Sequence, residues 1–402
     1  MKRDQPKVAR SNLAFSDEIE VVIEKLVAGG DGLARHEGMP VFVARTAPGD
    51  RVRVRVTQRK PSYARAEIVE LLRAGAARRE PRCRHFGECG GCDLQHLEDD
   101  LQVEYKVAAT VETLTRLGRV ELPAPRVVSG SSWGYRTRTQ LHTTLPRDRA
   151  PGERPVVGYH ARQSHRLIAV EECPVLVPEL ESIVRRLSAA PSSELPPRID
   201  LAVGGNGDLT SAPVIEDLPH GEVETRVGEY TYRFDARCFF QGHRELLPRL
   251  VEGVVGTGTG ELAVDLYAGV GLFALPLARR YERVVAVEGH RIAVRYGRIN
   301  VRRNRLANVE VVHQAVESWI SSLPRDCDRV VVDPPRAGLG SSVLARLKAA
   351  SPACLTYASC HPAALARDLA ALDEAYKVGG LTMIDLFPQT GHIEVVAELT
   401  LR

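Results

Sequence analysis

A glycine-rich turn between a hydrophobic strand and a helix is the feature that most constrains the fold of this chain. Residues 260–267 read as a strand, Ala268-Gly-Val-Gly follows as a turn, and a helix is expected from Leu272. Further strands are expected at 284–288, 309–312, 329–333, 355–358, 381–385 and 393–399. Strands that alternate with helical stretches predict a doubly wound α/β sheet.

The same turn is a candidate binding site. Gly269 and Gly271 would let the backbone approach a ligand closely, and Glu288 ends the next strand, where a carboxylate can bind ribose hydroxyls. The turn lacks the Gly-x-Gly-x-x-Gly pattern of a pyrophosphate site. A single nucleoside such as S-adenosylmethionine is therefore favoured over a dinucleotide, while a turn without a ligand is the alternative for the glycine pair alone.

A candidate reaction centre involves Asp333, Cys360 and Glu394. Asp333 and Cys360 each follow a predicted strand, so they are expected at the same edge of the sheet. A thiolate there could add to C6 of a uracil ring, which would allow C5 to attack an electrophilic methyl group. Glu394 is the candidate base that would then remove the C5 proton. Taken singly, an inert strand-end thiol and an ordinary polar residue are the alternatives.

Three cysteines, Cys83, Cys89 and Cys92, lie within ten residues, and Cys173 follows much later. Four thiolates suit either structural zinc or a [4Fe–4S] cluster, and their spacing does not decide between the two. The chain has no long apolar run and no signal-peptide pattern, which predicts a cytoplasmic location, no membrane association, and a disulfide only as the weakest option. Buried thiols without a ligand role are expected for the other cysteines, Cys238, Cys327 and Cys354.

Residues 18–72 have short alternating segments separated by turns, which predict a small β-barrel. Its segment 50–56 places Arg51, Arg53 and Arg55 on one face. Residues 1–80 hold 16 Lys and Arg against 11 Asp and Glu, and residues 133–166 hold seven Arg against two acids. These segments suit a polyanion such as RNA, and solvated surface charge is the alternative.

From residue 16 onward the chain resembles the RNA (uracil-C5)-methyltransferases, in particular the branch with an N-terminal TRAM domain and a [4Fe–4S] cluster that acts on 23S ribosomal RNA. Residues 16–74 are similar to TRAM, an OB-like RNA-binding barrel. The resemblance rests on ordered blocks: Cys83-x5-Cys-Gly-Gly-Cys with Cys173, Phe239-Phe-Gln, Asp265-Leu-Tyr-Ala-Gly-Val-Gly, Asp333-Pro-Pro-Arg-Ala-Gly, Ser359-Cys-x-Pro with Ala366-Arg-Asp-Leu, and Phe387-Pro-x-Thr-x-His-x-Glu.

The resemblance implies a role for each matched residue. Cys360 is the expected nucleophile and Glu394 the expected base. The expected ligands of the cluster are Cys83, Cys89, Cys92 and Cys173. The expected S-adenosylmethionine site comprises Gln241, Tyr267, Gly269, Gly271, Glu288 and Asp333.

Two histidines depart from the family pattern. His243 and His361 stand where the family commonly has asparagine, which affects the hydrogen bonds expected around the target base. A histidine beside Cys360 could favour the thiolate.

The predicted architecture has three parts: an OB-like TRAM barrel (residues 1–75), a β-rich central iron–sulfur domain (76–240), and a Rossmann-like, seven-stranded, S-adenosylmethionine-dependent methyltransferase domain (241–402). The predicted function is C5 methylation of a uridine in RNA, with 23S ribosomal RNA as the expected partner and no protein partner. A transfer-RNA methyltransferase of the same family, or a non-catalytic RNA-binding or ribosome assembly factor, are the alternatives.

Overall fold

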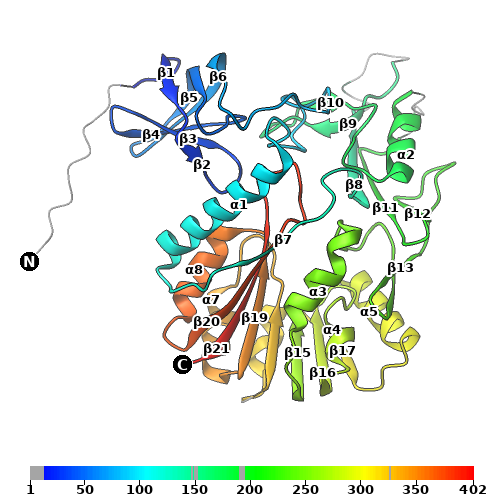
Figure 1. Ribbon diagram of the computed structural model, residues 1–402. Coiled ribbons are helices and arrows are strands. Elements are labelled where there is room, and N and C mark those ends of the chain that lie inside the picture. Colours follow the sequence, from blue (N-terminus) through cyan, green and yellow to red (C-terminus); the bar gives the residue numbers. More distant parts are fainter. Residues whose placement is uncertain (1–12, 146–147, 149–152, 190–194, 326) are drawn as a thin grey trace, which may run out of the picture. The chain divides into compact units, whose positions relative to one another are not determined.

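The structure is a computed structural model that describes residues 13–145, 148, 153–189, 195–325 and 327–402 (Figure 1). Residues 1–12 of the predicted barrel domain, and Arg147 and Arg149 of the second basic segment, lie outside the described residues. The chain divides into two compact units, one of residues 1–110 with 388–392, the other of residues 111–387 with 393–402. The three-domain division at residues 75 and 240 stays a prediction.

The first unit contains a six-stranded sheet at the positions where strands were expected. Val52, Val54 and Val56 are buried in its core, while the arginines between them face outward, as the alternation predicts. The strand order is β1-β5-β6-β4-β3-β2, with β1 (Glu18–Val22), β2 (Lys25–Leu26), β3 (Gly32–His36), β4 (Met39–Val43), β5 (Arg51–Arg59) and β6 (Ala64–Arg73).

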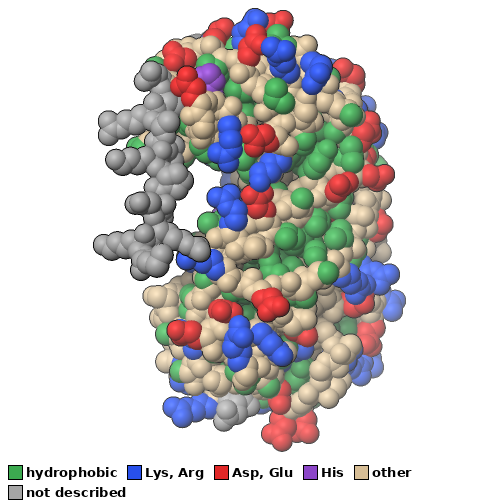
Figure 2. Space-filling model, turned by 60° about the vertical axis from the view of Figure 1, so that its left-hand side comes forward, with side chains coloured by type: hydrophobic (Ala, Val, Ile, Leu, Met, Phe, Trp, Pro, Cys, Tyr) green, Lys and Arg blue, Asp and Glu red, His purple; other side chains and the backbone are tan. Residues whose placement is uncertain are grey.

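The arginines of β5 are paired with acids and do not form an open row of cations. Arg51 binds Glu20 at 2.9 Å, and Arg55 binds Glu18 at 2.6 Å. Arg53 binds Glu70 at 2.6 Å. The acids come from β1 and β6, the strands on either side of β5, so they were not visible in the sequence of β5 itself. Exposed pairs of this kind contribute about 0–1 kcal/mol each, so their main effect is to neutralise this face. Figure 2 likewise shows Lys and Arg side chains beside Asp and Glu side chains on the face that it displays.

The cysteine-bearing segment of the first unit is tied to the sheet by a buried ion pair. Asp50 is completely buried, and Arg78 donates to it at 2.8 Å. Asp50 also accepts from the backbone N–H of Gly75 at 2.8 Å. Helix α1 (Asp99–Thr113) follows the cysteines and continues into a π-helical turn, η1 (Leu114–Gly118).

Three sheets occur in the described part of the second unit. The first has the order β10-β9-β8-β11-β12, with β8 (Arg138–Thr143), β9 (Val157–His160), β10 (Leu167–Ala169), β11 (Arg198–Val203) and β12 (Leu209–Ala212), and it shares a core with α2 (Pro178–Ala189). The second is the hairpin of β13 (Val223–Val227) and β14 (Tyr230–Phe234).

The third sheet has eight strands in the described residues, in the order β17-β16-β15-β18-β19-β21-β20-β7. All run parallel except β21. The strands are β7 (Arg126–Val128), β15 (Gly260–Leu266), β16 (Tyr281–Glu288), β17 (Val309–His313), β18 (Arg329–Val332), β19 (Cys354–Ser359), β20 (Tyr376–Ile384) and β21 (Glu394–Leu401). Residues 241–402, the predicted methyltransferase domain, contribute seven of these strands, and the eighth, β7, comes from residues assigned to the predicted central domain. With only three residues, β7 is too short to give a periodic signal.

Helices alternate with the strands of this sheet, as predicted. They are α3 (Leu247–Val255), α4 (Ala274–Leu277), α5 (Arg291–Arg303), α6 (Val316–Trp319), α7 (Ser341–Ala350) and α8 (Pro362–Leu372), with 3-10 turns η3 (Arg244–Leu246) and η4 (Ile320–Ser322). No described helix is both long enough and apolar enough to cross a membrane.

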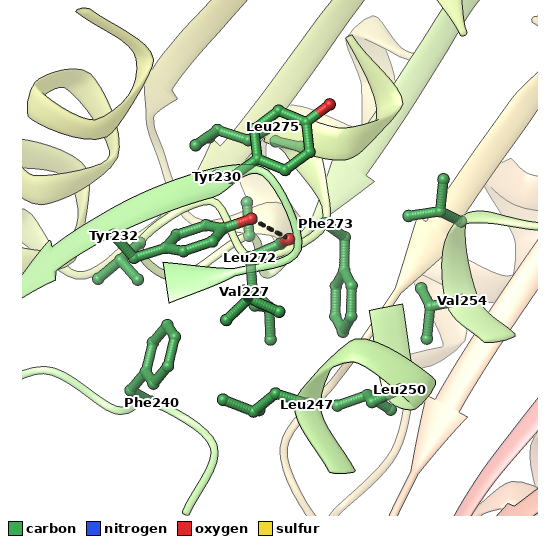
Figure 3. Close-up of a cluster of buried hydrophobic side chains, with 14 of the residues drawn as sticks. Val227, Tyr230, Tyr232, Phe240, Leu247, Leu250, Val254, Leu272, Phe273 and Leu275 are labelled. Atoms are coloured by element: carbon green, nitrogen blue, oxygen red, sulfur yellow. Dashed lines mark hydrogen bonds between the residues drawn. The ribbon is translucent and has the colours of Figure 1, made fainter. Parts of the chain in front are cut away.

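The hairpin β13–β14 shares a hydrophobic core with the eight-stranded sheet (Figure 3). Tyr232 is completely buried and donates its hydroxyl to the carbonyl of Leu272 at 3.0 Å. Asn300 of α5 donates to the carbonyl of Val270 at 3.0 Å and accepts from the backbone N–H of Arg233 at 2.7 Å. The glycine turn after β15 is therefore held from two sides by buried hydrogen bonds.

Candidate active site

The functional residues predicted in the methyltransferase region meet at one edge of the eight-stranded sheet. β15, β16, β18 and β19 are parallel, and Leu266 is in register with both Val287 and Val332. β21 is antiparallel and begins where β19 ends, with Ser359 opposite Val395. One further step in that register places Cys360 opposite Glu394. The structure thus brings Asp333 and Cys360 to the same edge, as the sequence predicted, and the reversed direction of β21 adds Glu394 to them.

Cys360 lies between β19 and α8 and is half-buried. Burial raises the pKa of its thiol, and the negative charges of Glu394 and Asp333 raise it further. Arg336 opposes this by its charge and by a hydrogen bond to the thiol. Arg336 was not singled out as a site residue, although the Asp-Pro-Pro-Arg block contained it. Its position makes it the group that favours the thiolate.

Two buried carboxyl groups accompany the thiol. Glu394 is 2% exposed, and burial, together with the charge of Asp333, raises its pKa well above the usual value. Burial raises the pKa of Asp333 to about 7. A negative charge on Asp333 disfavours ionisation of Glu394, so the two groups together bind protons more tightly than isolated carboxylates do before substrate binds. A carboxylate with a raised pKa is suited to accept a proton near neutral pH.

The loop that carries Asp333 and Arg336 is held by a buried carboxylate, Asp368 of α8. Asp368 accepts from the backbone N–H of Leu339 at 2.7 Å and from the hydroxyl of Tyr357 at 2.7 Å. Arg367 binds Asp368 at 2.8 Å and donates to the carbonyl of Ala337 at 2.7 Å. These bonds give the Ala-Arg-Asp-Leu block a physical role, which is to position the Asp-Pro-Pro-Arg loop.

Gly338 lies at the closest approach of this loop to α8, and its replacement by alanine is expected to impair the site. Its φ is +79°, and an added Cβ would lie 2.5 Å from Oδ2 of Asp368, an atom that its hydrogen bonds hold in place. The conformational strain alone costs about 1 kcal/mol. We expect Gly338→Ala to lower both the melting temperature and the methylation rate. Gly340→Ala is the matched control, because no atom lies within 4 Å of an added Cβ there. Equal effects of the two substitutions would contradict this role for Gly338.

The glycine turn has the geometry of a ligand cradle. Gly269 and Gly271 have φ values of +56° and +93°. Glu288 accepts from the backbone N–H of Gly269 at 2.8 Å, which fixes the turn against the end of β16. Tyr267 has a φ of +62° and donates its hydroxyl to Glu317 at 2.9 Å.

Two buried acceptors in this region have no hydrogen-bond partner among the described residues. They are Oε1 of Gln241 and the carboxylate of Asp265, which are 5% and 0% exposed and which make no hydrogen bond of good geometry, although the backbone of Ala274 lies close enough to Asp265 to lower its pKa. Burial raises the pKa of Asp265 well above its usual value. Buried acceptors of this kind normally require a donor, which the hydroxyl and amino groups of a nucleoside can supply. The residues present therefore fit S-adenosylmethionine.

Both of the unusual histidines have contacts within the second unit. His361 is the N-cap of α8, and its Nδ1 accepts from the backbone N–H of Ala364 at 3.2 Å. His243 is stacked on Tyr135, with ring centroids 4.6 Å apart, and burial lowers its pKa. The expectation that His361 favours the thiolate stays a prediction.

The cysteines predicted as metal ligands are divided between the units. Cys83, Cys89 and Cys92 belong to the first unit, and Cys173 belongs to the second. The backbone N–H of Gly91 donates to Sγ of Cys89 at 3.4 Å. Within the described residues, no group of three or more His, Cys, Asp or Glu side chains is arranged to hold a metal ion. Cys238 and Cys327 are buried, as expected, and Cys354 is half-buried.

Sequence families match both ends of the chain. The family described as tRNA (Uracil-5-)-methyltransferase matches residues 215–401, and the TRAM domain matches residues 17–69. The prediction of a TRAM domain is thereby confirmed, with the match covering residues 17–69 of the predicted 16–74.

Curated relatives match almost the whole chain. A protein of Pectobacterium atrosepticum named 23S rRNA (uracil(1939)-C(5))-methyltransferase RlmD is 33% identical, over 94% of this chain and 93% of the relative. A protein of the same name from Salmonella typhi is 34% identical, over 96% of this chain and 97% of the relative.

A solved structure is similar over the same extent. The Pyrococcus abyssi tRNA (uracil-54, C5)-methyltransferase in complex with S-adenosyl-L-homocysteine matches with a TM-score of 0.73 and 25% identity, over 95% of this chain and all of that one. The fold is that of class I S-adenosylmethionine-dependent methyltransferases with an N-terminal TRAM domain. The chain therefore belongs to the RNA (uracil-C5)-methyltransferase family and is an S-adenosylmethionine-dependent enzyme that methylates C5 of uracil in RNA.

Proposed function

We propose that this enzyme methylates a uridine of 23S ribosomal RNA, the one that corresponds to uracil 1939 in the names of its relatives, through a covalent bond between Cys360 and C6 of the base. The relatives with that name, which match nearly the whole chain, support the choice of RNA. The observation that supports the mechanism is the register of β19 and β21, in which Ser359 and Val395, the neighbours of Cys360 and Glu394, lie opposite each other.

The chain's own residues divide the chemistry into two steps. Cys360 would add to C6 as a thiolate, the form that Arg336 favours by its charge and hydrogen bond against the effect of burial, and C5 then becomes nucleophilic. S-adenosylmethionine supplies the electrophilic methyl group that C5 takes. Glu394 then removes the proton from C5, the C5–C6 double bond re-forms, and the sulfur of Cys360 leaves. Because the target edge of a stacked base is covered, the base is expected to flip out of its helix.

The proposed S-adenosylmethionine site comprises residues from three strand ends and one loop. Glu288 would bind the ribose hydroxyls, and the turn at Gly269 and Gly271 would lie against the nucleoside. The polar atom of Gln241 that lacks a protein partner supports its place in this site. The remaining proposed members are Tyr267 and Asp333.

Transfer RNA is the second candidate substrate. The Pyrococcus abyssi protein whose title names tRNA uracil-54 matches this chain over its full length, so the presence of an N-terminal domain does not by itself exclude transfer RNA. The test is to compare methylation, by the full-length protein, of a 23S fragment that contains the uridine corresponding to uracil 1939 with methylation of an unmodified tRNA transcript. We expect methyl incorporation in the 23S fragment, blocked when that uridine is replaced by cytidine. Methylation of the tRNA alone would overturn the choice of ribosomal RNA.

We also propose that Cys83, Cys89, Cys92 and Cys173 bind a [4Fe–4S] cluster, with zinc as the alternative. Four thiolates suit both groups, and a backbone N–H directed at a cysteine sulfur, as at Cys89, is common around such clusters. Protein purified without oxygen is expected to be brown and to contain iron and acid-labile sulfide in equal amounts, and Cys89→Ser is expected to lose both. Cys354→Ser, outside the set, is expected to retain them. A colourless protein that contains zinc would overturn the cluster.

A further inference from the structure

The loop before Glu394 belongs to a different unit from the strand that it precedes. Phe387 and Ile393 belong to the second unit, whereas the five residues between them, 388–392, belong to the first. The chain therefore leaves the second unit and returns to it just before the residue proposed as the base. These five residues are joined to Glu394 through a single buried residue, Ile393.

Gln389 anchors this loop in the first unit. It is completely buried and has a φ of +67°, a strained value for a residue with a side chain. Gln102 of α1 bonds it twice, donating to its Oε1 at 3.0 Å and accepting from its backbone N–H at 3.1 Å. Its Nε2 donates to Asp99 at 2.6 Å. Its carbonyl accepts from the backbone N–H groups of Asp93 and Leu94 at 2.9 and 3.0 Å. Strain held by so many bonds often marks a functional position.

A second contact at Gly391 fixes the same loop. Its backbone N–H donates to Asp93 at 3.1 Å. A Cβ added to Gly391 would clash with the backbone of Gly29 and Gly30, the turn that follows β2. Asp93 directly follows Cys92, so one residue connects the proposed cluster loop to the loop before Glu394. The anchor thus uses residues from both parts of the first unit, the sheet and the cysteine segment.

We propose that Gln389 is a positioning residue for Glu394, through which the N-terminal unit controls removal of the C5 proton. This inference rests on the proposed function, in which Glu394 is the base. Cys360 is held independently, by β19 and α8 of the second unit. Loosening the anchor should therefore impair the second chemical step and spare the first. An ordinary stabilising role would affect both steps alike.

The test is a single-turnover experiment with the full-length protein, S-adenosylmethionine carrying a radioactive methyl group, and the 23S fragment. Gln389→Ala is expected to transfer methyl at a rate near that of the unaltered protein, and to release product about 10- to 100-fold more slowly, the cost of a small misplacement of a catalytic group. The methylated protein–RNA adduct should then be visible on a denaturing gel. Gln102→Ala should give the same adduct, and the double substitution should add little, because both remove one anchor. If Gln389→Ala does not fold, Gln389→Asn replaces it.

Two controls separate the possible failures. Arg78→Lys weakens the buried ion pair with Asp50 in the same unit but does not alter the loop of residues 388–392. It should lower the melting temperature without causing the methylated protein–RNA adduct to accumulate. An adduct with Arg78→Lys equal to that with Gln389→Ala would overturn the inference, as would an equal slowing of both steps by Gln389→Ala. Glu394→Gln should itself accumulate the adduct. If it does not, the assignment of the base fails, and this inference fails with it.

Discussion

Replacing Cys360 by alanine is expected to abolish methylation, with a fall of at least about 10⁴-fold in the single-turnover rate. Without a sulfur to add to C6, C5 of uracil is too weak a nucleophile to take the methyl group. RNA bearing 5-fluorouridine at the target position should form a stable covalent complex with the unaltered protein, because fluorine cannot be removed as a proton. The complex should be absent from Cys360→Ala.

The matched control is Cys354→Ala, at the opposite end of the same strand. Cys354 is half-buried and its pKa is raised by burial, so it resembles Cys360 in environment but lies away from the site. It should retain methylation and the fluorouridine complex. Methylation by Cys360→Ala at the unaltered rate would remove the covalent mechanism.

Replacing Glu394 by glutamine is expected to separate methyl transfer from turnover. The amide fills the same space but cannot take the C5 proton, so the methylated adduct should persist and steady-state turnover should fall about 10²- to 10⁴-fold. The adduct would be measured by denaturing gel and by mass spectrometry of the Cys360 peptide. Release of product at the unaltered rate would exclude Glu394 as the base.

The same substitution is expected to make stability less dependent on pH. The pKa of Glu394 is higher in the folded protein than in the unfolded chain. Its favourable contribution to folding stability is therefore complete at pH values below the unfolded-state pKa, and it is lost as the pH rises through the folded-state pKa. Glutamine has no proton to lose. Between pH 5 and pH 9 the melting temperature of Glu394→Gln should therefore fall less than that of the unaltered protein. A steeper fall would show that Glu394 is not buried as a protonated acid.

The placement of the reaction centre could be predicted because it depends on strand order. Parallel strands with functional residues at their carboxyl ends bring those residues together whatever the loops do, so Asp333, Cys360 and Glu288 were correctly placed. Glu394 joined them because β21 runs the opposite way and starts at that edge. This reversal was not stated in the prediction, although the position of the block in the sequence was.

Features that depend on contacts between distant segments were not predictable. The acids that pair with Arg51, Arg53 and Arg55 are on other strands, and the periodicity of one strand carries no information about its neighbours. The three-residue strand β7 is recognisable only by its pairing with β20. The cap formed by His361 depends on where α8 begins, a detail of one or two residues that patterns do not define.

The single reversed strand in the large sheet has a consequence for how such an enzyme can acquire new substrates. Because β21 starts at the edge that carries Cys360, the connection leading into it lies at that edge, and it is not needed to complete the sheet. An additional domain can therefore bind that connection without disturbing any strand pairing. The domain attached to that connection can then differ between enzymes while the sulfur and the acid keep their places in the sheet.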